Sequence, residues 1–145
     1  MILLDVGVWL AGLWGKHPDH EAVQKWRTTK EESLAFCRVT QMGLLRLLTN
    51  PSVLREDTLS RARAWDVLDS VSSDDRVTFL DEPAGLQLHW RALSARDDKS
   101  HKLWTDDYLA AFALASGAPF ATLDRAVAGR YLTLRVETVG TSPAS

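Results

Sequence analysis

The chain has 145 residues, of which 46% are hydrophobic, and a formal net charge of −2 with a pI near 6.1. This length supports one domain with a substantial core, and the charge gives no global sign of a polyanion-binding protein. The single cysteine, Cys37, cannot form an internal disulfide and is interpreted as a small buried hydrophobic residue, which fits a reducing cytoplasm. No run approaches the roughly 18 apolar residues of a membrane span, and no basic residue precedes the apolar N-terminal stretch, so we expect neither a membrane segment nor a signal peptide.

The first half of the chain is predicted to contain two strands and three helices. In chain order, we expect a strand at 2–10, a helix from Asp19 to about Thr29, a strand at 33–39, a helix that Thr40 caps and Asn50–Pro51 ends, and a helix at about 57–71. The segment 2–10 is almost continuously apolar, as in a strand covered on both faces of a parallel sheet. In 57–71, apolar residues recur every three positions and place Trp65 and Leu68 on an inward face.

The second half continues the alternation. In chain order, we expect a strand at 76–80, a helix from Pro83 with Leu86, Trp90 and Leu93 inward, a buried helix at 104–116 ended by Gly117, a strand at 119–124, a short helix or turn at 124–131, and an edge strand at 134–139. Strands alternating with helices imply right-handed crossovers. We therefore predict an α/β fold with three layers, α/β/α, around a central and mainly parallel sheet in a single domain.

Three aspartates fall at comparable places in this topology. Asp5 lies in the first apolar segment, Asp106 in the first turn of the helix at 104–116, and Asp124 at the end of the strand FATLD. The functional crevice of a parallel sheet lies beyond the carboxyl ends of its strands, so these acids can meet there. Crowded carboxylates raise one another's pKa or require a cation, which predicts a Mg²⁺ or Mn²⁺ site.

Each aspartate also has a purely structural explanation. Asp5 can cap a turn or pair with an arginine, Asp106 and Asp107 are acids at a helix start favoured by the dipole, and Asp124 can begin a turn. Because one topology brings all three aspartates together, their joint placement favours a metal site over three separate structural roles.

Three blocks of the sequence resemble a known family. LLDVGVWLAG is similar to the LLDxNxWLA opening of PIN-domain ribonucleases, and WTDDYLAAFALASGAPFATLDRA is similar to their TDAYLAALAxxxGxxLxTxDRxF segment. CRVTQMGLLRLLTN resembles the middle block of the VapC-like toxins of bacterial toxin–antitoxin modules. The blocks occur in the family's order from residue 2 to about 138. A PIN-like nuclease domain is therefore expected at 1–138, with a flexible tail at 139–145.

The resemblance implies a site. Asp5, Asp106 and Asp124 match the three aspartates that hold Mg²⁺ or Mn²⁺ in PIN domains, and Thr122 matches a position whose hydroxyl often assists them. Gln41 stands where relatives often carry a glutamate and is included among the catalytic candidates, because its amide can accept a hydrogen bond from metal-bound water.

Two positions differ from the family pattern. Gly7 replaces a common asparagine, so a polar side chain near the site is absent. Asp107 replaces a common small residue and is either a helix-start acid or an additional, water-mediated ligand.

The resemblance further implies a Mg²⁺-dependent endoribonuclease that acts as a toxin, forms a homodimer, is inhibited by a VapB-like antitoxin, and works in the cytoplasm. The alternatives are a non-toxin RNA-processing nuclease and a catalytically weakened module that binds RNA or protein. RNA binding next to acids needs cations, and the candidates near the site blocks are Arg38, Arg46, Arg125 and Arg130, the last more readily read as an ordinary ion pair. Trp14, beside two glycines, is expected to be exposed and able to stack on an unpaired base.

Overall fold

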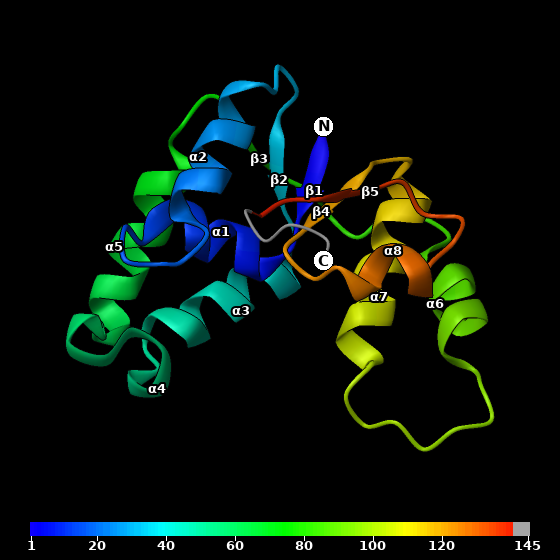
Figure 1. Ribbon diagram of the computed structural model, residues 1–145. Helices are drawn as coiled ribbons and strands as arrows, with labels where there is room; N and C mark the ends of the chain where they lie inside the picture. The colour runs from blue at the N-terminus through cyan, green and yellow to red at the C-terminus, as the bar shows by residue number, and fades with distance from the viewer. Residues whose placement is uncertain (141–145) are drawn as a thin grey trace.

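The computed structural model describes residues 1–140, which form a five-stranded sheet with all neighbouring strands parallel (Figure 1). The strand order is β3-β2-β1-β4-β5. The strands are β1 (Ile2–Leu4), β2 (Leu34–Phe36), β3 (Val77–Phe79), β4 (Phe120–Thr122) and β5 (Val136–Thr138). The order places β5 at an edge, as predicted for 134–139.

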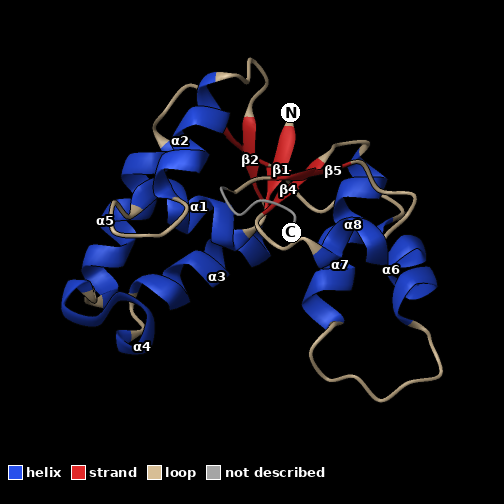
Figure 2. Ribbon diagram, viewed as in Figure 1, coloured by secondary structure: helices blue, strands red, loops and turns tan. Residues whose placement is uncertain are grey.

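Helices connect the strands and cover both faces of the sheet (Figure 2). They are α1 (Val6–Leu13), α2 (His20–Thr28), α3 (Arg38–Leu48), α4 (Pro51–Leu54), the 3₁₀ turn η1 (Arg55–Asp57), α5 (Arg61–Ser72), α6 (Leu86–Ser94), α7 (Trp104–Ser116) and α8 (Ala126–Arg130). No helix in the described residues is both long enough and apolar enough to span a membrane.

Alternate residues of each central strand belong to two separate hydrophobic clusters. Ile2 and Leu4 of β1 pack with residues of α1, α2, α3 and α5. Leu3, between them, packs with residues of α6, α7 and α8. Because successive side chains of a strand point to opposite faces, this partition confirms the predicted three layers.

The predicted strand at 2–10 is wrong beyond Leu4. The chain leaves the sheet at Asp5, whose carboxylate accepts a hydrogen bond of 2.8 Å from the Val6 backbone N–H and caps α1. Residues 8–11 are all buried in this helix. A continuous apolar run is typical both of a helix buried on most sides and of a strand covered on both faces. Hydrophobic periodicity therefore could not distinguish the two.

Two helix starts also differ from expectation. α3 begins at Arg38, and Thr40 lies within its first turn, where its hydroxyl accepts a hydrogen bond of 2.9 Å from the Cys37 N–H. α5 begins at Arg61, four residues later than the predicted 57, and Ser60 caps it. Trp65 of α5 is 51% exposed, which contradicts its predicted inward orientation.

A third helix start differs as well, because α6 begins at Leu86 and not at the predicted Pro83, and the strand predicted at 33–39 covers only Leu34–Phe36 before α3 begins. The remaining elements follow the prediction closely. α7 spans 104–116 as expected and ends at Gly117, whose φ of 66° is left-handed, a region that favours glycine. Cys37 is buried, with 1% of its surface exposed, as predicted for a small hydrophobic residue. The tail predicted for 139–145 lies mostly outside the described residues, and the domain boundary at 138 stays a prediction.

Candidate active site

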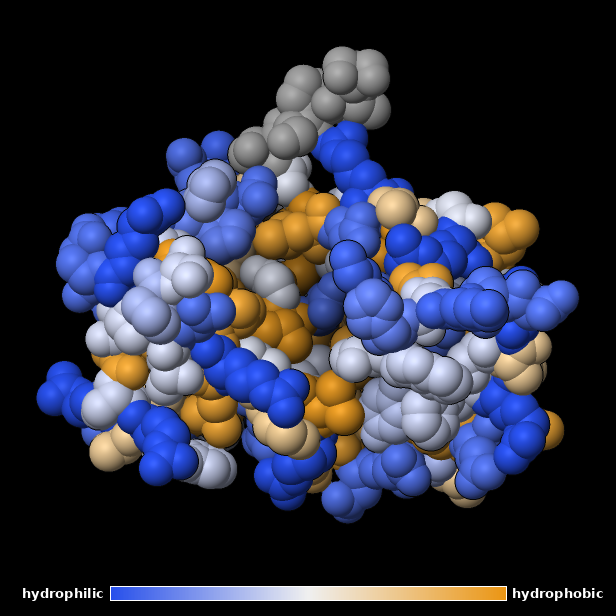
Figure 3. Space-filling model, turned by 90° about the horizontal axis from the view of Figure 1, so that it is seen from below, coloured by the Kyte–Doolittle hydropathy of each residue, from blue (hydrophilic) through white to orange (hydrophobic). Residues whose placement is uncertain are grey.

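Asp5 and Asp124 follow the carboxyl ends of adjacent strands. β1 pairs with β4, and the Asp5 N–H donates a hydrogen bond of 2.9 Å to the Ala121 carbonyl of that strand. The surface onto which the strands end is hollowed, with hydrophobic side chains gathered inside the hollow (Figure 3). The sheet therefore brings two of the predicted acids to the same edge, at the carboxyl ends of neighbouring strands.

A buried threonine joins these two acids. The Thr122 hydroxyl donates to Asp5 Oδ2 at 3.0 Å and accepts from the Asp124 backbone N–H at 3.1 Å. Asp124 Oδ1 in turn accepts from the Ala126 N–H at 2.9 Å, at the start of α8. The resemblance placed an assisting hydroxyl at Thr122, and the structure shows that it holds the Asp5 carboxylate.

Asp106 enters from the first turn of α7. Burial raises the pKa of its carboxyl group, and the negative charges of Asp5 and Asp124 raise it further. Arg130, whose Nη1 lies 3.5 Å from Asp106 Oδ2, acts in the opposite direction. Asp5 and Asp124 therefore lie near enough to Asp106 for their negative charges to act on it.

The carboxyl group of Asp5 is also hard to ionise. Burial is the main cause of its raised pKa, and the charge of Asp124 adds to it, whereas hydrogen bonds from Thr122 and Val6 oppose the rise. A positive charge placed among these acids would favour their ionised forms.

The donor chemistry fits a hard divalent cation. The candidate ligands are carboxylate oxygens, which Mg²⁺ and Mn²⁺ prefer, and their mutual repulsion is what a cation offsets. Within residues 1–140, no three His, Cys, Asp or Glu side chains meet the spacing needed to enclose a metal ion. The fit is therefore one of charge and ligand type.

Asp107 has a partner that sequence reasoning missed. Its side chain is buried, with 7% exposed, and its Oδ1 accepts a hydrogen bond from the Tyr131 hydroxyl. The neighbouring pair, Asp106 and Arg130, bridges the same two elements. The only sequence signal for this double link is a pair of consecutive aspartates at 106–107 and an arginine followed by a tyrosine at 130–131.

Gln41 is engaged within its own helix. Its amide oxygen accepts a hydrogen bond of 2.7 Å from Arg38 Nη1, and the Arg38 guanidinium lies 4.7 Å from the centroid of the Phe79 ring. Of the other arginines considered for RNA, Arg46 contacts the Met42 sulfur at 3.7 Å from an exposed position, and Arg125 is exposed. The predicted ion pair of Arg130 is present.

The tryptophans near the N-terminus belong to the core and its border. Trp9 is buried and stacks on Phe36 with ring centroids 3.8 Å apart. Trp14 is half-buried against the same core, and its indole N–H donates to Asp57 at 2.9 Å, which differs from the exposure expected for a stacking residue. An exposed tryptophan does occur at Trp104, which the sequence interpretation had placed only within a buried helix.

Residues 2–130 match the family described as the PIN domain, which covers β1 to α8 and all three predicted acids. The match extends over most of the chain. The chain belongs to the PIN-domain family.

Among individual proteins, the chain is similar to Ribonuclease VapC41 of Mycobacterium tuberculosis, with 40% identity over 132 residues that cover 87% of this chain and 90% of that protein. Ribonuclease VapC44 of the same organism is 33% identical over 127 residues, covering 87% of each. The fold resembles that of VapC20 from M. tuberculosis, described as a sarcin–ricin loop cleaving toxin, with a TM-score of 0.66, 15% identity, and 89% and 94% of the two chains covered. It also resembles VapBC2 from Rickettsia felis, solved bound to a promoter DNA fragment, with a TM-score of 0.69, 15% identity, and 96% and 99% covered.

Proposed function

We propose that this chain is a Mg²⁺-dependent endoribonuclease, the toxin of a VapBC-type toxin–antitoxin module. The observation that carries the proposal is the hydrogen-bonded link from Asp5 through the Thr122 hydroxyl to the Asp124 backbone, at the carboxyl ends of two adjacent strands. Similarity to VapC41 over nearly the whole length of both proteins supports the ribonuclease class.

In this proposal, Asp5, Asp106 and Asp124 hold the divalent cation, and Mn²⁺ can replace Mg²⁺. When bound, the cation polarises the scissile phosphate and lowers the pKa of a water molecule. Thr122 keeps the Asp5 carboxylate oriented through its hydrogen bond. Arg130, next to Asp106, supplies a positive charge that an RNA phosphate can contact.

The test is cleavage of single-stranded RNA by the purified chain with Mg²⁺, Mn²⁺ or EDTA. We expect Asp5→Asn and Asp106→Asn to lower the rate by roughly 100-fold, about 2.7 kcal/mol of barrier, because each removes a charged ligand. Asp66→Asn, at an exposed position of α5, is the matched control and should cleave like the parent. Parent-like rates for Asp5→Asn and Asp106→Asn would refute the site assignment.

Calorimetric titration with Mn²⁺ separates metal binding from catalysis. The parent should bind Mn²⁺, and Asp106→Asn should bind it more weakly. Equal binding by both would remove Asp106 from the ligand set.

The proposal extends to partners and location. We infer a cytoplasmic homodimer that a VapB-like antitoxin inhibits; the similar folds from Rickettsia felis and Salmonella typhimurium were solved as VapBC complexes with DNA. Co-purification with the product of an adjacent small reading frame, and light scattering of the isolated chain, test these two points. Mapping RNA 5′ ends after brief expression, beside Asp106→Ala, identifies the target RNA.

The glutamine at position 41 favours a second candidate function, a catalytically weakened binding module. An amide in place of a carboxylate adds no negative charge, so cation binding should be weaker than with four acids. A chain that binds RNA without cleaving it under any of the metal conditions would be the catalytically weakened binding module.

A further inference from the structure

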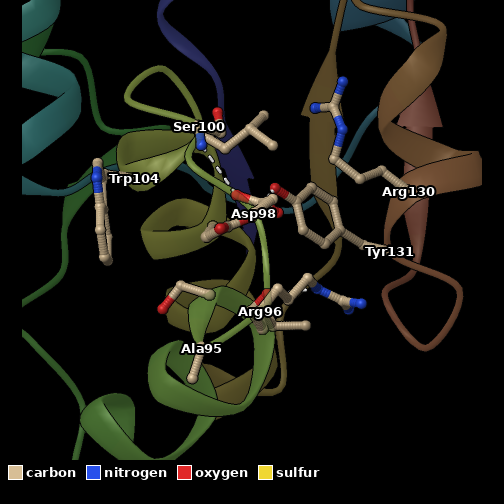
Figure 4. Close-up of a pocket in the computed structure, with 11 residues that line it drawn as sticks. Ala95, Arg96, Asp98, Ser100, Trp104, Arg130 and Tyr131 are labelled. Carbon is tan, nitrogen blue, oxygen red and sulfur yellow. Dashed lines mark hydrogen bonds between the residues drawn. The ribbon is translucent and has the colours of Figure 1, made fainter.

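A pocket of about 460 Å³ adjoins the acids. It lies between the end of α6, the segment 95–103, the start of α7 and the end of α8, and Figure 4 shows the side chains around it. Arg130 lines this pocket and also pairs with Asp106, while Asp107, the next residue along α7, forms part of its wall. A ligand in the pocket would therefore lie beside the proposed cation site.

The size of the pocket suits one small organic group. Its volume falls within the range of roughly 300–1,000 Å³ typical of small-molecule sites. A space of this size admits a single base turned out of a strand but not a double helix.

Its walls carry the chemistry that nucleotides require. Trp104 offers an indole ring that is 55% exposed. The Trp90 ring contacts it edge-on, with centroids 6.3 Å apart, and the Trp90 N–H donates to the Trp104 carbonyl at 3.2 Å. Trp104 is thereby anchored while much of its ring remains available for stacking.

Charged groups complete the lining. Arg96 and Arg130 place two guanidinium groups around the space, which suits the phosphates on either side of a base. Asp98 contributes carboxylate oxygens, which can accept hydrogen bonds from base N–H groups. Asp98 is held in place by the Ser100 N–H at 3.0 Å.

We propose that this pocket binds one unpaired base of the RNA strand next to the scissile phosphate, with Trp104 as the stacking residue. The proposal rests on the proposed ribonuclease function, because it is the substrate strand that must run from the acids into the adjoining space. In this proposal, the pocket and not the acid cluster sets the preference for particular RNA sequences.

The test compares decamers of oligoadenosine and oligouridine with an abasic decamer of the same backbone, by fluorescence anisotropy. All proteins carry Asp5→Asn so that the RNA stays intact. The background protein should bind the base-containing decamers roughly tenfold more tightly than the abasic one, as expected for stacking of one base. Trp104→Ala should lose that preference, and Trp104→Phe should keep most of it.

Two further variants sharpen the comparison. Trp65→Ala removes a similarly exposed indole from α5, outside the pocket lining, and should keep the full preference. Ser100→Trp places a bulky side chain in the pocket lining and should abolish the preference without touching Trp104.

The proposal would be overturned if Trp104→Ala and Ser100→Trp kept the preference for base-containing over abasic decamers. It would also be overturned if these variants lost affinity equally for all three decamers. Failure of the proposed function shows separately, as RNA that the parent chain leaves uncleaved with Mg²⁺ or Mn²⁺, and it does not alter the binding comparison.

Discussion

At the scale of single residues, hydrogen bonds hold two carboxylates in and beside the proposed cation site. Asp5 is held by Thr122, and Asp107 by Tyr131. In each case the partner comes from a distant part of the chain, so the bond exists only after folding. The two acids have different roles: the negative charge of Asp124 acts on Asp5, whereas Asp107 joins α7 to the end of α8.

Asp5→Asn should change the pH dependence of stability. The raised pKa of Asp5 means that the folded chain binds this proton more tightly than the unfolded chain, so its contribution to stability falls as the pH rises above the ordinary value of about 3.9. Asparagine still caps α1 but does not ionise. Urea unfolding in EDTA should therefore show the variant gaining stability over the parent between about pH 4 and pH 7.

Asp66→Asn controls for the general loss of one negative charge in that experiment. A stability difference between Asp5→Asn and the parent that stays constant or shrinks with rising pH would contradict the prediction.

Tyr131→Phe should destabilise the fold by about 1–3 kcal/mol, because it removes a hydrogen-bond donor from the buried Asp107 carboxyl group. Tyr108→Phe is the matched control, since its hydroxyl donates to the exposed Glu82 at 3.0 Å and should cost less. Chemical denaturation of both variants measures the loss in free energy of unfolding. Equal losses would show that the Tyr131–Asp107 hydrogen bond stabilises the fold no more than the exposed Tyr108–Glu82 bond does.

At the scale of elements, the packing of α1 on α3 positions Asp5. Gly43 of α3 lies so close to α1 that an added Cβ would stand 2.6 Å from Val6 Cγ2. Val6 is the residue whose N–H binds the Asp5 carboxylate, so this close approach fixes the capped start of α1. The sequence comparison treats Gly43 as one residue of a family block, and only the structure shows what it touches.

Gly43→Ala should therefore lower the free energy of unfolding by about 1–3 kcal/mol, because the β-branched Val6 side chain cannot rotate away freely. Gly7→Ala should instead raise it by about 0.5–1 kcal/mol, because its added Cβ would lie 3.6 Å from Leu123 and alanine favours the helix. Thermal or urea unfolding of the two variants checks the opposite signs; destabilisation by both would mean that the space beside Gly7 is also needed.

At the scale of the whole molecule, the last described residues are tied to the central sheet. Val139 is buried, with 5% exposed, and its N–H donates to the Thr122 carbonyl at 2.8 Å. Thr122 is the same residue that orients Asp5. The C-terminal segment thus supports the strand from which the site is built.

A chain ending at Thr138 should be less stable than one ending at Gly140 by about 1.5–3 kcal/mol, the value of burying a valine side chain. Unfolding of the two truncated chains measures this, and equal stability would favour the predicted domain boundary at 138.

The sequence alone determined the alternation of strands and helices and the place of α7 with its glycine end, because periodicity and motif spacing are local properties of the chain. Its three candidate acids stay a prediction. It failed at 6–13, where an apolar run is compatible with either a buried strand or a buried helix, and the capping bond from Asp5 decided for the helix. Only the tertiary structure revealed the Asp107–Tyr131 bond, the Gly43 contact and the pocket beside Trp104. These depend on which side chains meet across long separations in the sequence, and no local pattern specifies such meetings.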